Sequence, residues 1–303
     1  MLKILITGAS GLLGCNFIHQ SSSKNKILIH QNQRKIRNNE FITFKFDISK
    51  RSMIRDTLIE NTPDVIINSC GITDIDKCNK NPDLANYINA KIPQNLAYVA
   101  SDLGIKFVQI STDHLFDGTT SFVSEEAALK PLNSYASSKA LAEELVVKVN
   151  SDALIIRCNF FGWGPIYRAS FSDFIYYNLV KGNKINLAND YFYTPISTYK
   201  LNDTIHELIK NNASGIFNVV GSDRVSKLDF GLELSNIFKL DRKLIRSVNW
   251  NDLKMKTIRP VDMSLSDKKI KTLLGKNLGS IQKNIEHLKD QFNSNLYKKV
   301  RAA

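Results

Sequence analysis

The stretch KILITGASGLLG, residues 3–14, decides the fold of this chain. Its first half, Lys3–Thr7, is apolar and reads as a buried strand. Its second half places three glycines at three-residue spacing where a helix over Leu12–Ser21 begins. Glycine permits the positive φ of a tight turn and lets a ligand approach the backbone closely. The helix N-terminus offers free N–H groups and a positive dipole end. The stretch therefore predicts a turn for the pyrophosphate of a dinucleotide, with a ligand-free glycine turn as the alternative.

Short β-rich segments alternate with helix-length segments over the first 157 residues. The predicted strands are Lys3–Thr7, Ile27–His30, Phe41–Phe46, Val65–Asn68, Phe107–Ile110 and Leu154–Arg157. The predicted helices are Leu12–Ser21, Arg51–Glu60, Ala85–Leu103 and Tyr135–Val149, with Pro93 kinking the third of them. This alternation predicts an α/β fold in which parallel strands are joined by right-handed crossovers, a Rossmann-type doubly wound sheet.

After Arg157 the alternation stops, and the sequence predicts a smaller substrate domain interleaved with the first. The elements expected there are a helix over Thr204–Lys210, a strand over Gly215–Val220 and a helix over Leu228–Phe238. The expected dinucleotide-binding domain comprises residues 1–159 and a return segment near 190–213. Residues 160–189 and 214–296 are assigned to the substrate domain, and residues 297–303 to a frayed tail.

The composition is that of a folded globular chain, with 43% hydrophobic and 23% charged residues among 303. The chain starts without a basic segment followed by an apolar one, and no apolar run reaches the ~20 residues of a membrane helix. We therefore expect a cytoplasmic protein. Its four cysteines, which lack C-x-x-C pairing, are interpreted as reduced thiols.

The formal net charge of +12 admits binding to nucleic acid or to an anionic membrane. Because no nucleic-acid motif accompanies the charge, we interpret it as a lysine-rich surface that also attracts anionic ligands. The five histidines are scattered without metal-ligand spacing, so no metal site is expected. The sequence leaves the oligomeric state open, with a homodimer as one option.

The segment after the second strand distinguishes NADP from NAD. An acidic residue there would hold the ribose 2′-hydroxyl of NAD. This chain instead has His30-Gln31-Asn32-Gln33-Arg34-Lys35-Ile36-Arg37, with no carboxylate before Glu40. Arg34, Lys35 or Arg37 could bind a 2′-phosphate, and arginine suits it better because its fork is bidentate. The segment favours NADP, although a basic surface loop is the alternative.

Tyr135 and Lys139 lie four residues apart at the start of a predicted helix and so share one face of it. A neighbouring ammonium lowers the pKa of a phenol from its usual ~10, which suits Tyr135 to acid–base work on a carbinol oxygen. Lys139 could also hold ribose hydroxyls. Ser111 and Thr112 follow a predicted strand at the edge where open α/β sheets bind ligands. Thr112 is the candidate hydroxyl donor to the substrate oxygen, with Ser111 as the second choice.

These motifs resemble those of the extended short-chain dehydrogenase/reductases, and within them the dTDP-4-dehydrorhamnose reductase group. The resemblance runs over nearly the whole length. It rests on Gly8–Gly14, Asp47-Ile48, Pro63–Asn68, Thr73, Asp76-Lys77, Asn89-Ala90, Ser111–Gly118, Pro131–Asn133, Tyr135–Lys139, Thr194-Pro195 and Arg259-Pro260. The segment STDHLFDG, residues 111–118, is close to that group's S-T-D-Y-V-F-D-G. The resemblance implies a sugar-nucleotide reductase in activated-sugar and surface-polysaccharide biosynthesis, which uses NADP or NAD to reduce a 4-keto sugar.

The resemblance and the motifs together give a full set of expected site residues. The expected catalytic residues are Thr112, Tyr135 and Lys139. The expected cofactor-binding residues are Gly8, Ser10, Gly11, Leu12, Leu13, Gly14, Gln33, Arg34, Asp47, Ile48, Cys70, Gly71, Thr73, Asn89, Ser111, Tyr135 and Lys139. The expected substrate-binding residues are Thr73, Asp113, His114, Phe116, Asn159, Phe160, Trp163 and Arg259.

The sequence departs from the group's pattern at positions expected to face the sugar. His114 replaces the usual tyrosine, which we interpret as a packing or hydrogen-bonding change. The segment Asn189–Pro195 replaces the group's D-Q-x-G-x-P-T pattern. Because this segment is expected to contact the sugar, a substrate other than dTDP-4-dehydrorhamnose stays open. Trp163 could stack on a base or a sugar, but an aromatic residue at a domain seam is more often core.

Three other functions stay open beside the reductase. An NAD-dependent sugar-nucleotide epimerase uses the same residues, and tightly retained NAD would favour it. A 4,6-dehydratase is disfavoured because His114 stands where that class, by resemblance, carries glutamate after Asp113. A non-catalytic NADP-binding regulatory subunit, a role known among relatives of this group, is compatible with an intact Tyr135–Lys139 pair.

Overall fold

The structure is a computed structural model that describes residues 1–32, 34, 36 and 41–303. Its centre is a seven-stranded sheet in which every neighbouring pair of strands is parallel. The strands are β1 (Lys3–Thr7), β2 (Lys26–His30), β3 (Ile42–Phe44), β4 (Val65–Asn68), β5 (Lys106–Ile110), β6 (Leu154–Arg157) and β11 (Gly215–Asn218), in the order β11-β6-β5-β4-β1-β2-β3. The chain order reverses between β1 and β4, which is where doubly wound sheets bind ligands. The predicted fold class is confirmed.

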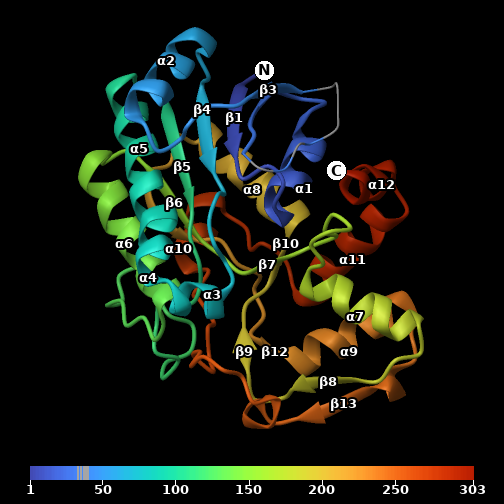
Figure 1. Ribbon diagram of the computed structural model, residues 1–303. Coiled ribbons are helices and arrows are strands. Elements are labelled where there is room, and N and C mark those ends of the chain that lie inside the picture. The colour runs from blue at the N-terminus through green and yellow to red at the C-terminus, as the bar shows by residue number, and fades with distance from the viewer. Residues whose placement is uncertain (33, 35, 37–40) are drawn as a thin grey trace.

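Helices cover both faces of this sheet, as Figure 1 shows. One face carries α1 (Leu12–Ser21), α8 (Thr198–Lys210) and α10 (Lys268–Leu274), and the other carries α2 (Arg51–Asn61), α5 (Ile92–Asp102) and α6 (Ser134–Val149). The strands are buried on both faces, so neighbouring residues of one strand belong to different cores. Ile4 and Ile6 pack with α1 and α8, while Leu5 packs with α2 and α5.

The long helix predicted over Ala85–Leu103 is a continuous but irregular helical stretch. It consists of α4 (Pro82–Asn86), a π-helical turn over Tyr87–Lys91 and α5. A proline ring clashes with the carbonyl four residues earlier in a regular helix, and the wider turn directly before Pro93 relieves that clash. The π-helical turn carries Asn89, which faces the cavity described below.

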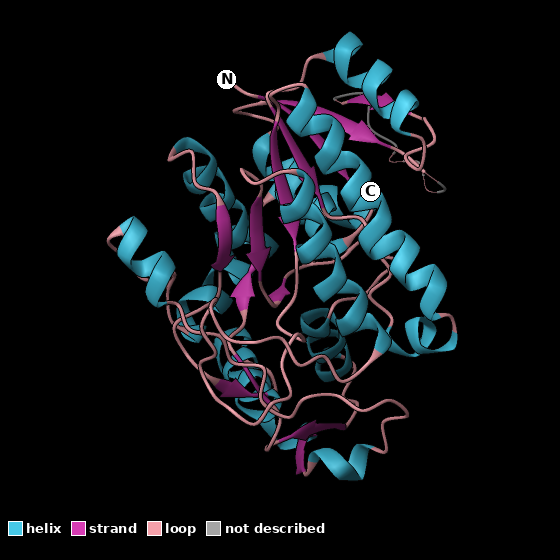
Figure 2. Cartoon of the chain, turned by 90° about the vertical axis from the view of Figure 1, so that its left-hand side faces the viewer, coloured by secondary structure: helices cyan, strands magenta, loops and turns pink. Residues whose placement is uncertain are grey.

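The second half of the chain adds a smaller unit beyond one end of the sheet, seen in Figures 1 and 2. Its strand pairs are β7 (Phe160–Phe161) with β10 (Ile196–Ser197), β9 (Phe192–Tyr193) with β12 (Val225–Ser226), and β8 (Ile185–Ala188) with β13 (Ile245–Val248). Its helices include α7 (Phe171–Val180), α9 (Lys227–Phe238) and α11 (Ile281–Phe292). Helices α7 and α9 each begin with a capping box, Ser170 with Asp173 and Ser226 with Asp229.

Two of the predicted boundaries need correction. Strand β11 pairs with β6, with Gly215 opposite Leu154. This part of the segment 214–296, which was assigned to the substrate domain, therefore belongs to the central sheet. Residues 297–303 are not a frayed tail: α12 (Asn295–Ala302) buries Val300 and contacts α1. The rest of the division into domains stays a prediction. Within the described part of the chain, no helix is long and apolar enough to cross a membrane.

Candidate active site

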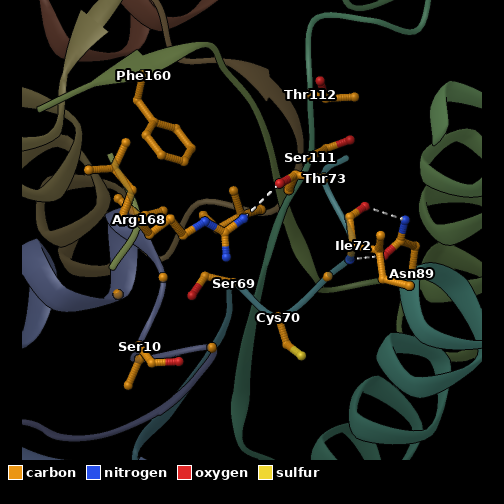
Figure 3. Close-up of a pocket in the computed structure, with 18 of the residues that line it drawn as sticks. Ser10, Ser69, Cys70, Ile72, Thr73, Asn89, Ser111, Thr112, Phe160 and Arg168 are labelled. Atoms are coloured by element: carbon orange, nitrogen blue, oxygen red, sulfur yellow. Dashed lines mark hydrogen bonds between the residues drawn. The ribbon is translucent and has the colours of Figure 1, made fainter. Parts of the chain in front are cut away.

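A cavity of about 500 Å³ opens at the carboxyl ends of β1, β4 and β5, next to the second unit. This volume lies within the usual range for ligand sites. Its wall comes from the glycine turn, the segment after β2, the loop after β4, the segment after β5, helix α6 and the loop before α7. Figure 3 shows part of this lining. Of the expected site residues, it includes Gly8, Ser10, Gly11, Leu12, Leu13, Gly14, Arg34, Cys70, Gly71, Thr73, Asn89, Ser111, Thr112, Asp113, His114, Tyr135, Lys139, Asn159 and Phe160.

The glycine turn fits a pyrophosphate because no side chain could occupy its key positions. Gly8 has a φ of +73°, and a Cβ there would lie 2.7 Å from the backbone nitrogen of Cys70. A Cβ on Gly14 would collide with the backbone of Gly8 and Ala9. Gly11 is the N-cap residue of α1, whose first N–H groups face the cavity without a side-chain cap. Backbone donors at this helix end suit a phosphate group.

The loop after β4 is held in place by Asn89. Its amide oxygen accepts from the Ile72 nitrogen at 2.7 Å, and its amide nitrogen donates to the Ile72 carbonyl and to the Ser138 hydroxyl. A Cβ on Gly71 would lie 2.9 Å from the same amide oxygen, so glycine is required for this close approach. Asn89 therefore joins the β4 loop to α6 and fixes the wall that carries Cys70 and Thr73 (Figure 3).

The basic segment after β2 is described only in part. Arg34 lines the cavity and its guanidinium lies 4.1 Å from the centre of the Tyr167 ring. Gln33, Lys35 and Arg37 lie outside the described residues, so the binding role expected for Gln33 stays a prediction.

Thr112, Tyr135 and Lys139 meet in the same cavity as the glycine turn. Tyr135 hydrogen-bonds to Thr112, and Lys139 donates through Nζ to the Ile110 carbonyl at 2.7 Å. Burial raises the pKa of the Tyr135 phenol, and the hydrogen bond to Thr112 opposes this only in part. The expected lowering of the Tyr135 pKa is therefore wrong for this structure, because desolvation of the phenolate dominates that pKa.

Burial also affects Lys139, whose pKa it lowers to about 8 in spite of the negative charge of Glu143. Glu143 accepts from Ser111 Oγ at 2.5 Å and forms a buried ion pair with Arg157, at 2.7 Å. This pair lies under the strand ends that carry Ser111. The Ser111 hydroxyl is thus engaged by Glu143, whereas the Thr112 hydroxyl bonds to the phenol, which supports Thr112 as the first choice of hydroxyl donor.

Asp113, His114 and Asn159 form the wall beside Tyr135. Asn159 donates to the buried Asp113 carboxylate at 2.6 Å, and the His114 ring packs edge-on against the Tyr135 ring at 5.7 Å. Burial lowers the pKa of His114 and the charge of Asp113 only partly offsets this. The imidazole is therefore neutral at neutral pH, as expected for a packing and hydrogen-bonding role.

Five of the expected site residues that the structure describes do not line the cavity, and four of them are engaged elsewhere. Asp47 is exposed, and its carboxylate accepts from the backbone nitrogen and the hydroxyl of Ser49. Ile48 and Phe116 are buried in hydrophobic clusters, where their apolar side chains are shielded from water. Trp163 is 1% exposed, packs among aromatic rings of the second unit and donates its indole N–H to the Leu288 carbonyl at 2.8 Å. The packing of Trp163 corrects the binding role expected for it, and the roles expected for Asp47, Ile48 and Phe116 stay predictions.

Arg259 lies outside the cavity wall but near it. Its positive charge, like that of Lys227, contributes to lowering the pKa of His114. Its Nε is buried without a hydrogen-bond partner in the structure. A role for Arg259 toward the substrate stays a prediction.

Sequence reasoning missed Arg168, which lines the cavity from the loop before α7. Its side chain donates to the Thr73 hydroxyl at 2.8 Å, shown by a dashed line in Figure 3. No motif of the sequence marks this position, because it follows an aromatic, glycine-containing segment without periodicity. Among the residues that the structure describes, no three metal-ligating side chains gather into a metal site.

Comparison with known proteins places this geometry among sugar-nucleotide enzymes. A family model described as the RmlD substrate binding domain matches residues 2–294. The probable low-salt glycan biosynthesis reductase Agl14 of Haloferax volcanii is 29% identical over 296 residues, 95% of this chain and 97% of that protein. Methionine adenosyltransferase 2 subunit beta of Xenopus laevis is 25% identical, over 81% and 75% of the two chains. A crystal structure of a dTDP-4-dehydrorhamnose reductase from Clostridium acetobutylicum matches with a TM-score of 0.84 and 26% identity, over 97% and 100%.

Proposed function

The chain belongs to the RmlD substrate binding domain family, among the extended short-chain dehydrogenase/reductases, and from this premise we propose that it reduces the 4-keto group of a sugar nucleotide with NADPH. The observation that carries the proposal is the convergence of Thr112, Tyr135 and Lys139 on the cavity that also contains the glycine turn. One end of this cavity suits a pyrophosphate and the other holds a proton donor. A dinucleotide and a carbonyl substrate could therefore meet between them.

The chemistry divides between the cofactor and the chain. The bound nicotinamide supplies the hydride that reduces the carbonyl carbon. Tyr135 gives a proton to the carbonyl oxygen, and its raised pKa keeps the phenol protonated at neutral pH, as a proton donor must be. The Thr112 hydroxyl, hydrogen-bonded to the phenol, helps to orient it and to polarise the carbonyl.

Lys139 would hold the ribose hydroxyls of the cofactor with a positive charge, and this makes the reaction sensitive to pH. With a pKa of about 8, Lys139 is charged below that pH and neutral above it. We expect kcat/KM for NADPH to fall by about tenfold per pH unit above about pH 8. A pH profile would measure this. The control is Lys139→Arg, because a guanidinium stays charged throughout and should remove this limb of the profile even if the rate is lower. An unchanged limb in Lys139→Arg would assign the titration to another group.

NADP is favoured over NAD by the basic segment after β2. Arg34 reaches the cavity, and its fork suits a 2′-phosphate. No carboxylate among the described residues of this segment is placed to accept from a ribose 2′-hydroxyl.

The substrate class is proposed from the relatives and from the site. The Clostridium protein is named a dTDP-4-dehydrorhamnose reductase and the Haloferax protein a probable glycan biosynthesis reductase. This supports a 4-keto-6-deoxy sugar nucleotide and a role in activated-sugar and surface-polysaccharide biosynthesis. Asp113, His114 and Asn159 line the sugar end of the cavity.

The test is NADPH oxidation by the purified protein with a panel of 4-keto-6-deoxy sugar nucleotides, followed by absorbance. Turnover with one or more of them is expected, and the product of that reaction identifies the stereochemistry at C4. Absence of oxidation with every member of the panel would contradict the reductase proposal.

Two alternatives have their own signatures. An epimerase would retain NAD through purification and interconvert two sugar nucleotides without net oxidation of NADPH. A regulatory subunit is suggested by the match to methionine adenosyltransferase 2 subunit beta. Such a protein would bind NADP tightly and show no turnover. The complete set of Thr112, Tyr135 and Lys139 in one cavity favours the reductase over that alternative.

We further propose that the protein works in the cytoplasm, where sugar nucleotides are available, and without a nucleic-acid partner. A homodimer is the assembly proposed. Sedimentation at two protein concentrations would distinguish it from a monomer.

A further inference from the structure

Residues 165–169, here called the strap, cross from the second unit to the dinucleotide end of the cavity. Tyr167 donates through its hydroxyl to the Ser10 carbonyl in the glycine turn at 2.9 Å. Arg168 donates to the Thr73 hydroxyl after β4 at 2.8 Å. The base of the strap is fixed by Gly164, which donates to Asp173 and accepts from Arg301. The strap thus connects the two walls of the cavity over the glycine turn.

The guanidinium of Arg168 carries a charge without an anionic partner in the described part of the chain. Its hydrogen bond goes to the neutral Thr73 hydroxyl, and no ion pair joins it to a carboxylate. An arginine has five donors, and the bond to Thr73 uses one of them, in a cavity wall that also contains Ser10 and Ser69 (Figure 3). Arg168 is solvent-exposed, so its charge needs no partner within the protein, and it stays available to an anion that enters the cavity it lines.

Tyr167 supports a second arginine of the same cavity. The Arg34 guanidinium lies 4.1 Å from the centre of the Tyr167 ring, within cation–π distance. Arg34 is exposed and comes from an irregular segment, so this ring is the described contact that orients it. The strap therefore carries one arginine of the cavity, Arg168, and orients a second, Arg34, through the Tyr167 ring.

We propose that Arg168 binds the cofactor pyrophosphate from the side opposite the glycine turn, and that Tyr167 positions Arg34 for the 2′-phosphate. This inference rests on the proposed function in so far as the cavity takes a nicotinamide dinucleotide. Backbone N–H groups of α1 and a bidentate arginine fork then enclose the pyrophosphate between them. The neighbouring Tyr167 contacts Ser10 in the glycine turn, which favours the cofactor over the diphosphate of the sugar nucleotide as the ligand of Arg168.

The experiment measures binding of NADPH and of NADH by calorimetry, without any sugar nucleotide. The pyrophosphate is common to both dinucleotides, whereas the 2′-phosphate is present only in NADPH. Arg168→Ala is expected to raise both dissociation constants by the same factor, about 10- to 100-fold, as for loss of a hydrogen bond to a charged group. Arg168→Lys should recover part of the loss. Arg34→Ala should raise the dissociation constant for NADPH alone.

Two variants of Tyr167 distinguish the contribution of its ring to NADPH binding from that of its hydroxyl. Tyr167→Leu is expected to raise the dissociation constant for NADPH by about 2- to 5-fold and to leave that for NADH nearly unchanged, because it removes the cation–π support of Arg34. Tyr167→Phe keeps the ring and should retain the preference for NADPH. The urea unfolding midpoint of each variant without dinucleotide checks that the fold is kept.

Equal binding of both dinucleotides by Arg168→Ala and the wild-type protein would overturn the role of Arg168. A loss confined to NADPH would also overturn it, since that pattern belongs to a 2′-phosphate ligand. An unchanged preference in Tyr167→Leu would overturn the positioning role of Tyr167. A wild-type protein that binds neither dinucleotide would contradict the proposed function itself, so the two failures are distinguishable.

Discussion

Replacement of Tyr135 by phenylalanine is expected to lower kcat for sugar-nucleotide reduction by about 10²- to 10⁴-fold, the usual contribution of a positioned general acid. The substitution removes only the hydroxyl. The phenylalanine ring retains the edge-on contact with His114 and the burial of the side chain, which is 8% exposed. The effect should therefore appear in kcat, while the dissociation constant for NADPH stays within about 2-fold of the wild-type value.

The measurement is steady-state oxidation of NADPH with the best substrate of the panel, together with calorimetric binding of NADPH. Tyr177→Phe is the matched control. It also removes one phenolic hydroxyl, but in the second unit, where that hydroxyl pairs with Tyr297. It should leave kcat unchanged. If Tyr135→Phe kept more than about a tenth of the wild-type kcat, another group would have to donate the proton.

The central sheet was predictable because its signal is local. Strands β1, β4 and β6 have the predicted bounds, since an apolar β-rich run between polar segments identifies a strand buried on both faces. Strand β11 was recognised as a strand but assigned to the wrong unit. It pairs with β6, although residues 158–214 separate the two strands in the sequence. Pairing between strands so far apart depends on packing that no local sequence pattern encodes.

The candidate site was predictable where its residues follow strands of the sheet or open a helix. The glycine turn, Thr112 and the Tyr135–Lys139 pair are fixed by backbone geometry and meet as expected in one cavity. Trp163 was misplaced because an aromatic side chain near a site fits a hydrophobic core equally well. Arg168 was missed because its loop position follows from contacts with Thr73 and Gly164 rather than from spacing. The raised pKa of Tyr135 depends on burial, which the sequence does not quantify.

A buried ion pair joins helix α6 to strand β6. Arg157, at the end of β6, is 2% exposed and directs Nε and Nη2 at the Glu143 carboxylate of α6. Glu143 also accepts from Ser111, and Arg157 donates to the Glu125 carbonyl at 3.2 Å. Each partner is thus fully engaged by polar groups. Removal of either would leave a buried charge without its counterion, which costs far more than the pair itself contributes.

Glu143→Gln is therefore expected to lower the free energy of unfolding by about 3–5 kcal/mol, and Arg157→Met by a similar amount. Urea denaturation, followed by circular dichroism without dinucleotide, measures both. The double variant is the control: with both charges gone, its loss should be closer to that of one single variant than to the sum. Losses that simply add would mean that the two side chains act independently. Losses below about 1 kcal/mol would mean that water reaches the remaining charge, as at a surface ion pair.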